Sequence, residues 1–170
     1  MDVLDCMAQR YSVRGYRSDP VDDETLTKVL EAARLAPTAA NRQPFRVLVI
    51  HTAGREGELA RIYGRPWFVQ APLVLAVVAV PGEAWRRMDD KPYDEVDATI
   101  AMDHLILAAA SLGLGTCWVA AFDPGAAREV LALPDDVEPV AFTPLGHPAV
   151  SAPARKKRRP LAELVRYERW

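Results

Sequence analysis

The sequence predicts an α+β domain, built as an α/β sandwich. Two observations carry this prediction: helical and strand-like patterns alternate along the 170 residues, and residues 72–80 (PLVLAVVAV) form an unbroken apolar run. Such a run is typical of a strand that is covered on both faces. A chain of this length can bury roughly two-thirds or more of the surface of its unfolded form. We therefore expect a single domain over residues 1–170, with residues 151–170 as a basic, proline-punctuated C-terminal arm.

The first half of the chain is expected to alternate helices with strands. Asp2 can cap a short helix, and Asp22 and Asp23 suit the positive N-terminal end of a second helix that Pro37 stops. Branched residues then predict a strand. The expected helices span residues 2–9, 21–36 and 54–63, and the expected strands span residues 45–50 and 72–80.

Residues 94–112 predict a long helix that is apolar on almost every side, and a helix of this kind must be buried. Asp97, Asp103 and His104 interrupt it, so the apolar run falls short of the roughly 20 residues that a membrane span requires. In a domain this small we expect a partner subunit to cover the helix. The remaining expected elements are strands at residues 116–120 and 137–145 and a helix at residues 124–131.

Composition argues against several classes of protein. The net charge of -2 gives no global basic field, so nucleic acid is a poor first candidate. Cys6 and Cys117 lie far apart without a metal-ligand spacing, which argues against a disulfide scaffold and a metal site. The histidines (His51, His104 and His147) form no evident triad. The N-terminus carries acids where a signal peptide would carry basic residues, so we expect a cytoplasmic protein.

Four polar segments are candidates for a binding site. In the first, Arg10, Ser12 and Arg14 alternate, so in extended backbone their side chains could converge on one anion. The alternative is a solvated turn with surface ion pairs. In the second, residues 36–45 (APTAANRQPF) offer amides and a hydroxyl that suit the edge of a heterocycle, or they form only a helix cap and a connecting loop.

The third segment, residues 113–122 (GLGTCWVAAF), permits close backbone approach at the start of a strand. It does not match the dinucleotide fingerprint, and it could equally be a tight turn with Trp118 in the core. The fourth, residues 155–159 (RKKRR), is a run of cations for which a small phosphate is at least as good a target as nucleic acid; the alternative is a solvated tail.

Taken in order, RYSVRGY, APTAANRQPF, GLGTCWVAAF, PLGHP and KKRRPLAEL resemble the compact FMN-dependent nitroreductase family over essentially the whole chain. The resemblance implies a nitroreductase-like fold, in which a central, mostly antiparallel sheet is flanked by helices. It also implies an intertwined homodimer that binds FMN in a cleft at the dimer interface, with contacts from both subunits.

The resemblance also implies a role for each candidate residue. The FMN phosphate would be held by Arg10, Ser12, Lys156 and Arg158, and Arg14 would face the N1 and O2 edge of the flavin. The other subunit would contribute Pro37, Thr38 and Asn41, with Thr38 in place of a common serine. Backbone groups near flavin N5 would come from Trp118, Val119, Ala120 and Ala121.

The implied activity is electron transfer from NADH or NADPH through flavin N5 to a small acceptor such as a nitroaromatic or a quinone. The flavin carries this chemistry, so no side chain is expected to be a catalytic acid or base. The segment at residues 81–93 is short and Ala120 stands where many larger members carry glutamate, so the acceptor pocket is expected to be open. Candidates to line it are Trp67, Phe68, Trp85, Tyr93 and Phe122. Dehalogenation, flavin breakdown, azoline oxidation and flavin binding without turnover remain alternatives.

Overall fold

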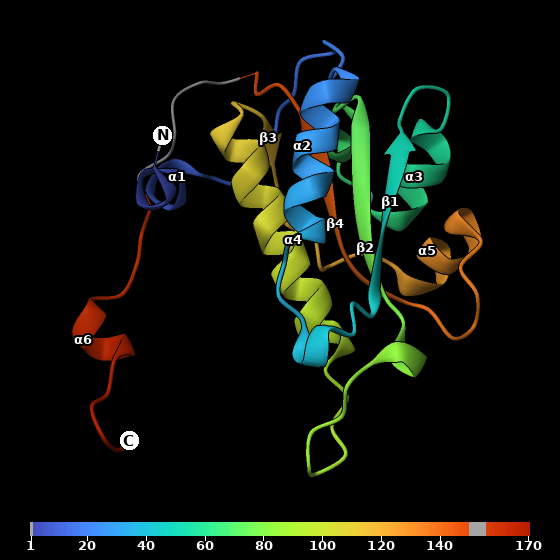
Figure 1. Ribbon diagram of the computed structural model, residues 1–170. Coiled ribbons are helices and arrows are strands. Elements are labelled where there is room, and N and C mark those ends of the chain that lie inside the picture. Colours follow the sequence, from blue (N-terminus) through green and yellow to red (C-terminus); the bar gives the residue numbers. More distant parts are fainter. Residues whose placement is uncertain (1, 150–155) are drawn as a thin grey trace.

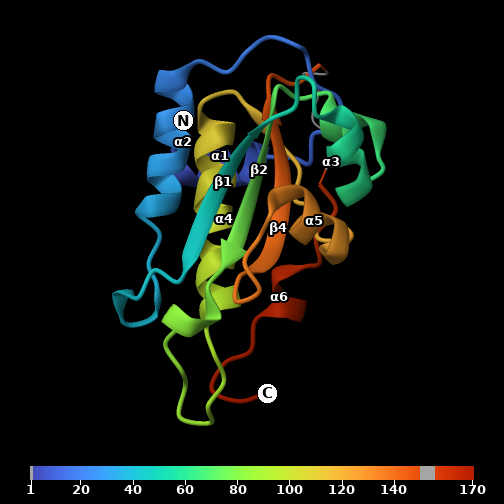
Figure 2. The same ribbon diagram turned by 90° about the vertical axis from the view of Figure 1, so that its right-hand side faces the viewer.

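A computed structural model describes residues 2–149 and 156–170 of the chain (Figure 1). Its centre is a four-stranded sheet of order β1-β2-β4-β3, in which every ladder between neighbouring strands is antiparallel. Helices lie on both faces, with α2 and α4 on one side and α3 and α5 on the other (Figure 2). The predicted α+β class and the mostly antiparallel sheet flanked by helices are therefore confirmed.

The helices and strands follow the predicted order closely. The α-helices are α1 (Val3–Gln9), α2 (Asp23–Arg34), α3 (Glu56–Ile62), α4 (Asp94–Ser111), α5 (Pro124–Leu131) and α6 (Leu161–Leu164). The strands are β1 (Phe45–His51), β2 (Leu73–Ala79), β3 (Gly115–Thr116) and β4 (Glu138–Gly146). Short 3-10 turns form at η1 (Ala39–Asn41), η2 (Pro66–Val69) and η3 (Pro81–Glu83).

Side-chain caps explain where the first two helices begin. The Asp2 carboxylate accepts a hydrogen bond from the Asp5 N–H at 2.8 Å, and Asp22 accepts one from the Thr25 N–H at the same distance. Each bond satisfies an N–H group that has no partner within its helix. The predicted cap at Asp2 is thus confirmed, and Asp22 caps the second helix from the position just before it.

The predicted strand at residues 116–120 is only partly formed. Gly115 and Thr116 pair with β4, but the Cys117 N–H donates to the Thr143 hydroxyl at 3.0 Å instead of to a main-chain carbonyl. Pairing resumes in a single bridge between Val119 and Phe142. The ladder is therefore shorter than expected because a side chain takes one of its hydrogen bonds.

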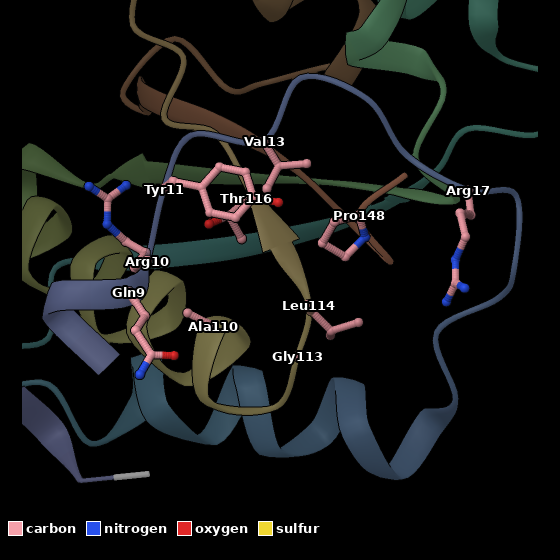
Figure 3. Close-up of a pocket in the computed structure, with 10 residues that line it drawn as sticks. All are labelled: Gln9, Arg10, Tyr11, Val13, Arg17, Ala110, Gly113, Leu114, Thr116 and Pro148. Atoms are coloured by element: carbon pink, nitrogen blue, oxygen red, sulfur yellow. The ribbon is translucent and has the colours of Figure 1, made fainter. Parts of the chain in front are cut away.

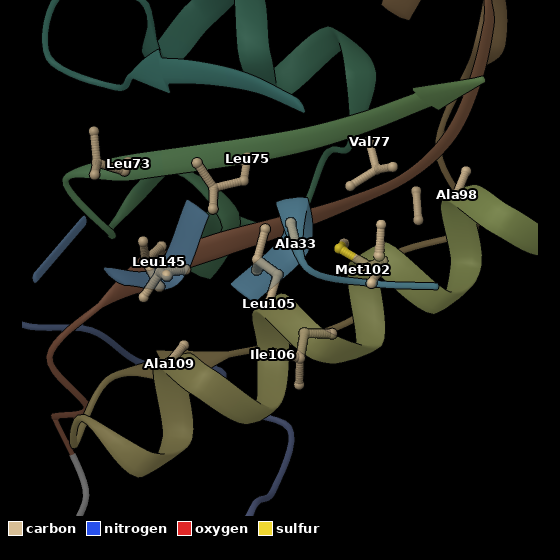
Figure 4. Close-up of a cluster of buried hydrophobic side chains, with 14 of the residues drawn as sticks. Ala33, Leu73, Leu75, Val77, Ala98, Met102, Leu105, Ile106, Ala109 and Leu145 are labelled. Carbon is tan, nitrogen blue, oxygen red and sulfur yellow. The ribbon is translucent and has the colours of Figure 1, made fainter. Parts of the chain in front are cut away.

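β2 is buried along its whole length, as its apolar run predicts. Alternate residues face the two layers of helices. On the face of α2 and α4 lie Leu73, Leu75, Val77 and Ala79, together with Met102 and Leu105 of α4 (Figure 4). On the face of α3 and α5 lie Val74 and Ala76, with Leu59, Phe68 and Phe142. The sheet therefore separates two apolar layers.

The outer side of α4 is only partly covered within this chain. α1 crosses it, and the Cys6 thiol donates to the Leu107 carbonyl at 3.1 Å. Val96 and Leu112 remain 39% and 38% exposed, and Leu4 of α1 is 71% exposed. Cover by a partner subunit remains a prediction. None of the helices among residues 2–149 and 156–170 is long and apolar enough to span a bilayer.

The C-terminal residues 156–170 lie along the outside of the body and carry α6 away from the sheet (Figures 1 and 2). The arm exposes its large side chains: Leu161 is 75% exposed, Leu164 61% and Tyr167 86%, and Trp170 is fully exposed. Apolar side chains gathered on an extended arm mark a surface that can bind another chain.

Candidate functional site

The segment that carries Arg10, Ser12 and Arg14 runs beside β3. Ser12 forms a parallel bridge with Thr116, and the Val13 N–H donates to the Thr116 carbonyl at 2.9 Å. Val13 is buried, so the extended backbone directs Ser12 and Arg14 to the opposite side.

Gly115 allows this approach. A Cβ atom at this position would lie 2.9 to 3.0 Å from the side-chain carbons of Val13, closer than side chains pack. The close backbone approach expected of the 113–122 segment is confirmed at this glycine.

The three polar side chains of this segment all affect the pKa of one buried group, the Cys117 thiol. Burial raises the pKa of Cys117, while the charge of Arg14, a hydrogen bond from Ser12 and the charge of Arg10 lower it. Ser12 and Arg14 thus lie beside the Cys117 thiol, while Arg10 acts on it through its charge alone and also borders the cavity of Figure 3. Convergence of the three side chains on one anion remains a prediction.

A second cluster joins the two ends of the chain. Lys156 donates a hydrogen bond to the Met7 carbonyl at the end of α1. Burial lowers the pKa of Lys156, and the positive charges of Arg10 and Arg158 lower it further. No carboxylate within the described ranges forms an ion pair with any of these three cations. Like charges held together without a counter-charge are suited to bind an anion. Arg155 lies outside the described residues.

Arg14 is exposed and lies against an aromatic ring. Its guanidinium carbon is 6.0 Å from the ring centre of Trp67, which belongs to η2. Trp67 in turn meets Tyr63 edge-on, with their ring centres 5.5 Å apart. A cation over an aromatic face is attracted by the ring, so Trp67 holds Arg14 in place. The sequence marked Trp67 only as a candidate for the acceptor pocket.

The 118–121 segment leaves backbone N–H groups free at its exposed end. Val119 exchanges both of its main-chain hydrogen bonds with Phe142, at 2.8 and 3.0 Å. Trp118 packs against the core on the α4 face. Ala120 and Ala121 are exposed, and their N–H groups have no backbone partner in the part of the chain that the structure describes. Of the expected backbone contacts, these two N–H groups are the most exposed to a ligand.

Pro37, Thr38 and Asn41 lie far from the cations. They lie in η1 or in the two residues before it. There the Ala39 N–H donates a hydrogen bond of 3.0 Å to the carboxylate of Asp97, which belongs to the first turn of α4. The Arg10–Arg14 segment instead faces the other end of that helix, near Ala110 (Figure 3).

The length of α4 sets this separation. Thirteen residues separate Asp97 from Ala110 along the helix. At 1.5 Å per residue they are about 20 Å apart along its axis. Within one chain, the structure does not bring the two predicted halves of the site together.

A cavity of about 540 Å³ lies beside the first segment (Figure 3). Its walls include Gln9, Arg10, Tyr11, Val13, Arg17 and Leu114. Of the predicted site residues only Arg10 borders it, so this cavity adjoins the predicted flavin cleft without coinciding with it.

The candidate pocket aromatics divide between core and surface. Phe68 is fully buried and meets Phe142 edge-on, and Phe122 packs on the same ring with 4.8 Å between centres. Phe68 is therefore one of the candidates that belong to the core, because its ring fills the layer under α3 and α5. Trp85 and Tyr93 instead pair at 5.3 Å at the base of the loop before α4.

Known proteins resemble the chain along most of its length. The model of the nitroreductase family matches residues 7–64 and 56–147. An FMN reductase (NAD(P)H) of Bacillus subtilis is 31% identical over 176 residues, which cover 94% of this chain and 70% of that protein.

Two solved structures share the fold. A nitroreductase family protein of Clostridium difficile superposes over the whole of both chains with a TM-score of 0.90 and 36% identity. A nitroreductase of Desulfovibrio desulfuricans, solved in complex with FMN, has a TM-score of 0.84 and 32% identity over 100% of this chain and 98% of that one.

Proposed function

This chain belongs to the nitroreductase family, and on that premise we propose that it is an FMN-dependent oxidoreductase that transfers electrons from NADH or NADPH to a small acceptor such as a nitroaromatic or a quinone. Bound FMN would supply the redox chemistry, taking up a hydride at N5 and releasing electrons to the acceptor. The observation that carries the proposal is the cluster of Arg10, Lys156 and Arg158, which the fold assembles from both ends of the chain.

The cluster fits the phosphate end of FMN. A phosphate monoester carries close to two negative charges at neutral pH. It would relieve the mutual repulsion that lowers the pKa of Lys156. An ammonium group has three donors, and only one of those of Lys156 is used on the Met7 carbonyl. Ser12, two residues after Arg10, would add a hydroxyl.

The remaining groups fit the ring end. Arg14, held against Trp67, would face the N1 and O2 edge of the flavin. A cation at that edge stabilises the negative charge of reduced flavin. The free N–H groups of Ala120 and Ala121 would lie near N5. These residues bind and orient the ring, and none of them is required to transfer a proton.

We propose that the working unit is a homodimer in which Pro37, Thr38 and Asn41 of one subunit reach the flavin of the other. The separation of about 20 Å along α4 supports this arrangement, since it keeps the two predicted halves of the site apart within one chain. The exposed apolar residues of α1, such as Leu4, and of the C-terminal arm supply surface for such an assembly.

One experiment tests the proposal directly. The purified protein should be yellow, should have the mass of a dimer in solution, and should lose its flavin absorbance when NADH or NADPH is added without oxygen. Adding a nitroaromatic or a quinone should restore the absorbance. A colourless monomer that does not bind added FMN would refute the proposal. Flavin-free protein that binds RNA, and loses this binding when residues 155–159 are deleted, would favour an interaction protein instead.

A further inference from the structure

The first turn of α4 carries a carboxylate in the interior of the protein. Asp97 is 1% exposed; its Oδ1 accepts a hydrogen bond from the Ala39 N–H at 3.0 Å, and its Oδ2 has no partner within the described residues. A buried carboxylate without a cation is costly. A costly buried group of this kind is retained in a fold when it holds a neighbouring segment in a particular position.

The segment that Asp97 contacts is strained. Ala40, Asn41 and Gln43 have φ values of 50°, 54° and 54°. Side-chain-bearing residues rarely adopt this left-handed region. Three of the four residues from 40 to 43 are therefore in an unfavourable conformation, and other contacts must hold them there.

Hydrogen bonds within the loop set its shape. The Gln43 N–H donates to the Thr38 hydroxyl at 3.1 Å, the Asn41 N–H donates to the Thr38 carbonyl at 3.0 Å, and the Gln43 amide donates to the Asn41 carbonyl at 3.1 Å. These bonds do not connect the loop to a helix. Among the described contacts, the bond from Ala39 to Asp97 is the one that ties residues 38–43 to α4.

We propose that Asp97 is a positioning residue for the flavin site: it fixes the place of the 38–43 loop on α4, and the loop then presents Pro37, Thr38 and Asn41 to the flavin of a second copy of this chain. This inference rests on the proposed function. Asp97 is 1% exposed, so it would act through the loop without touching the flavin itself. Pro37 and Asn41 are exposed and Thr38 is half-buried, so these residues make the contact.

The test compares FMN binding by four variants of the protein. Asp97→Ala removes the acceptor, and Asp97→Asn keeps an oxygen that can accept from Ala39. Ala39→Pro removes the N–H group that donates to Asp97. Ala39 is the first residue of η1, where proline fits the backbone. Glu95→Ala is the matched control, because it removes an exposed carboxylate from the same turn of α4.

We expect Asp97→Ala and Ala39→Pro each to raise the Kd for FMN at least tenfold and to change the visible circular dichroism of bound flavin. Asp97→Asn should stay within threefold of wild type, and Glu95→Ala should not change. The Tm of each apo-protein, measured in parallel, reports on folding. A loss of FMN affinity in Asp97→Ala and Ala39→Pro while the Tm of the apo-protein stays within a few degrees of wild type is the result that a general loss of stability would not produce.

Two outcomes would overturn the inference. In the first, Asp97→Ala binds FMN like wild type while Lys156→Ala does not, which leaves the proposed function intact. In the second, Asp97→Asn loses as much affinity as Asp97→Ala, with the same fall in Tm, which would make Asp97 a general stability residue. Wild-type protein that fails to bind FMN would overturn the proposed function and this inference together.

Discussion

Replacing Lys156 by alanine should weaken the binding of FMN and leave the binding of riboflavin unchanged. Lys156 is half-buried between the end of α1 and two arginines, and it keeps donors free for a phosphate. A hydrogen bond to a charged group contributes about 1.5–3 kcal/mol. Its loss corresponds to a Kd raised about 10- to 150-fold. Riboflavin has the same ring and chain but no phosphate, so it does not use this contact.

The matched control is Lys157→Ala. Lys157 is the next residue along the arm, is exposed, and carries the same charge. Its removal changes the net charge equally but should change the Kd for FMN less than threefold, because an exposed cation is screened by salt. Titration of apo-protein with each flavin, followed by fluorescence, measures both constants. The reasoning fails if the two variants weaken FMN equally, or if Lys156→Ala weakens riboflavin and FMN by the same factor.

The lowered pKa of Lys156 adds a dependence on pH. A depressed pKa means that the ammonium loses its proton at a lower pH than an ordinary lysine. A bound phosphate favours the charged form and raises that pKa again. FMN affinity should therefore fall as the pH rises through the pKa of Lys156 in the apo-protein. Lys156→Ala should lack this alkaline loss.

The remaining predictions concern the ring end, the close approach at β3 and the buried acid. Arg14→Ala should raise the Kd for FMN about tenfold and slow the reduction of bound flavin by NADH in stopped-flow absorbance; wild-type values of both would remove its assigned role. Gly115→Ala should lower the unfolding free energy by about 1–3 kcal/mol in urea titrations, because its Cβ would lie 2.9 Å from Val13; an unchanged midpoint would contradict the packing. Burial raises the pKa of Asp97 above 3.8, so the folded state binds the proton more tightly than the unfolded state does. The contribution of Asp97 to stability is then present below pH 3.8 and is lost as the pH rises through the folded pKa. Asp97→Asn should remove this loss in denaturant titrations at a series of pH values, and an equal pH dependence in both proteins would contradict it.

Local patterns in the sequence were sufficient to predict most of the fold. The apolar run of β2 and the cap at Asp2 are set by neighbours in the sequence, so their positions follow from periodicity and capping chemistry. The strand after Gly115 was overpredicted, because its interruption depends on the Thr143 hydroxyl, which lies 26 residues further along the chain. Sequence patterns do not show such a contact.

The site was predictable to the extent that its chemistry is local. The alternation of Arg10, Ser12 and Arg14 predicted one polar face; Ser12 and Arg14 both lower the pKa of the Cys117 thiol, whereas Arg10 also borders the neighbouring cavity. Asp97 was read only as an interruption of an apolar helix. Its contact with Ala39 joins residues 58 positions apart, and no spacing rule identifies such a pair.

The geometry of α4 connects the fold to the assembly. The cations lie near its C-terminal end, while the loop held by Asp97 lies at its N-terminal end, about 20 Å away. If two copies pack antiparallel through the exposed side of this helix, the N-terminal end of each comes to the C-terminal end of the other. Each flavin would then lie between the cations of one chain and the strained loop of its partner. It follows that a variant that dissociates the dimer should keep the phosphate cluster intact and still bind FMN weakly, because the contacts made by Thr38 and Asn41 would be lost.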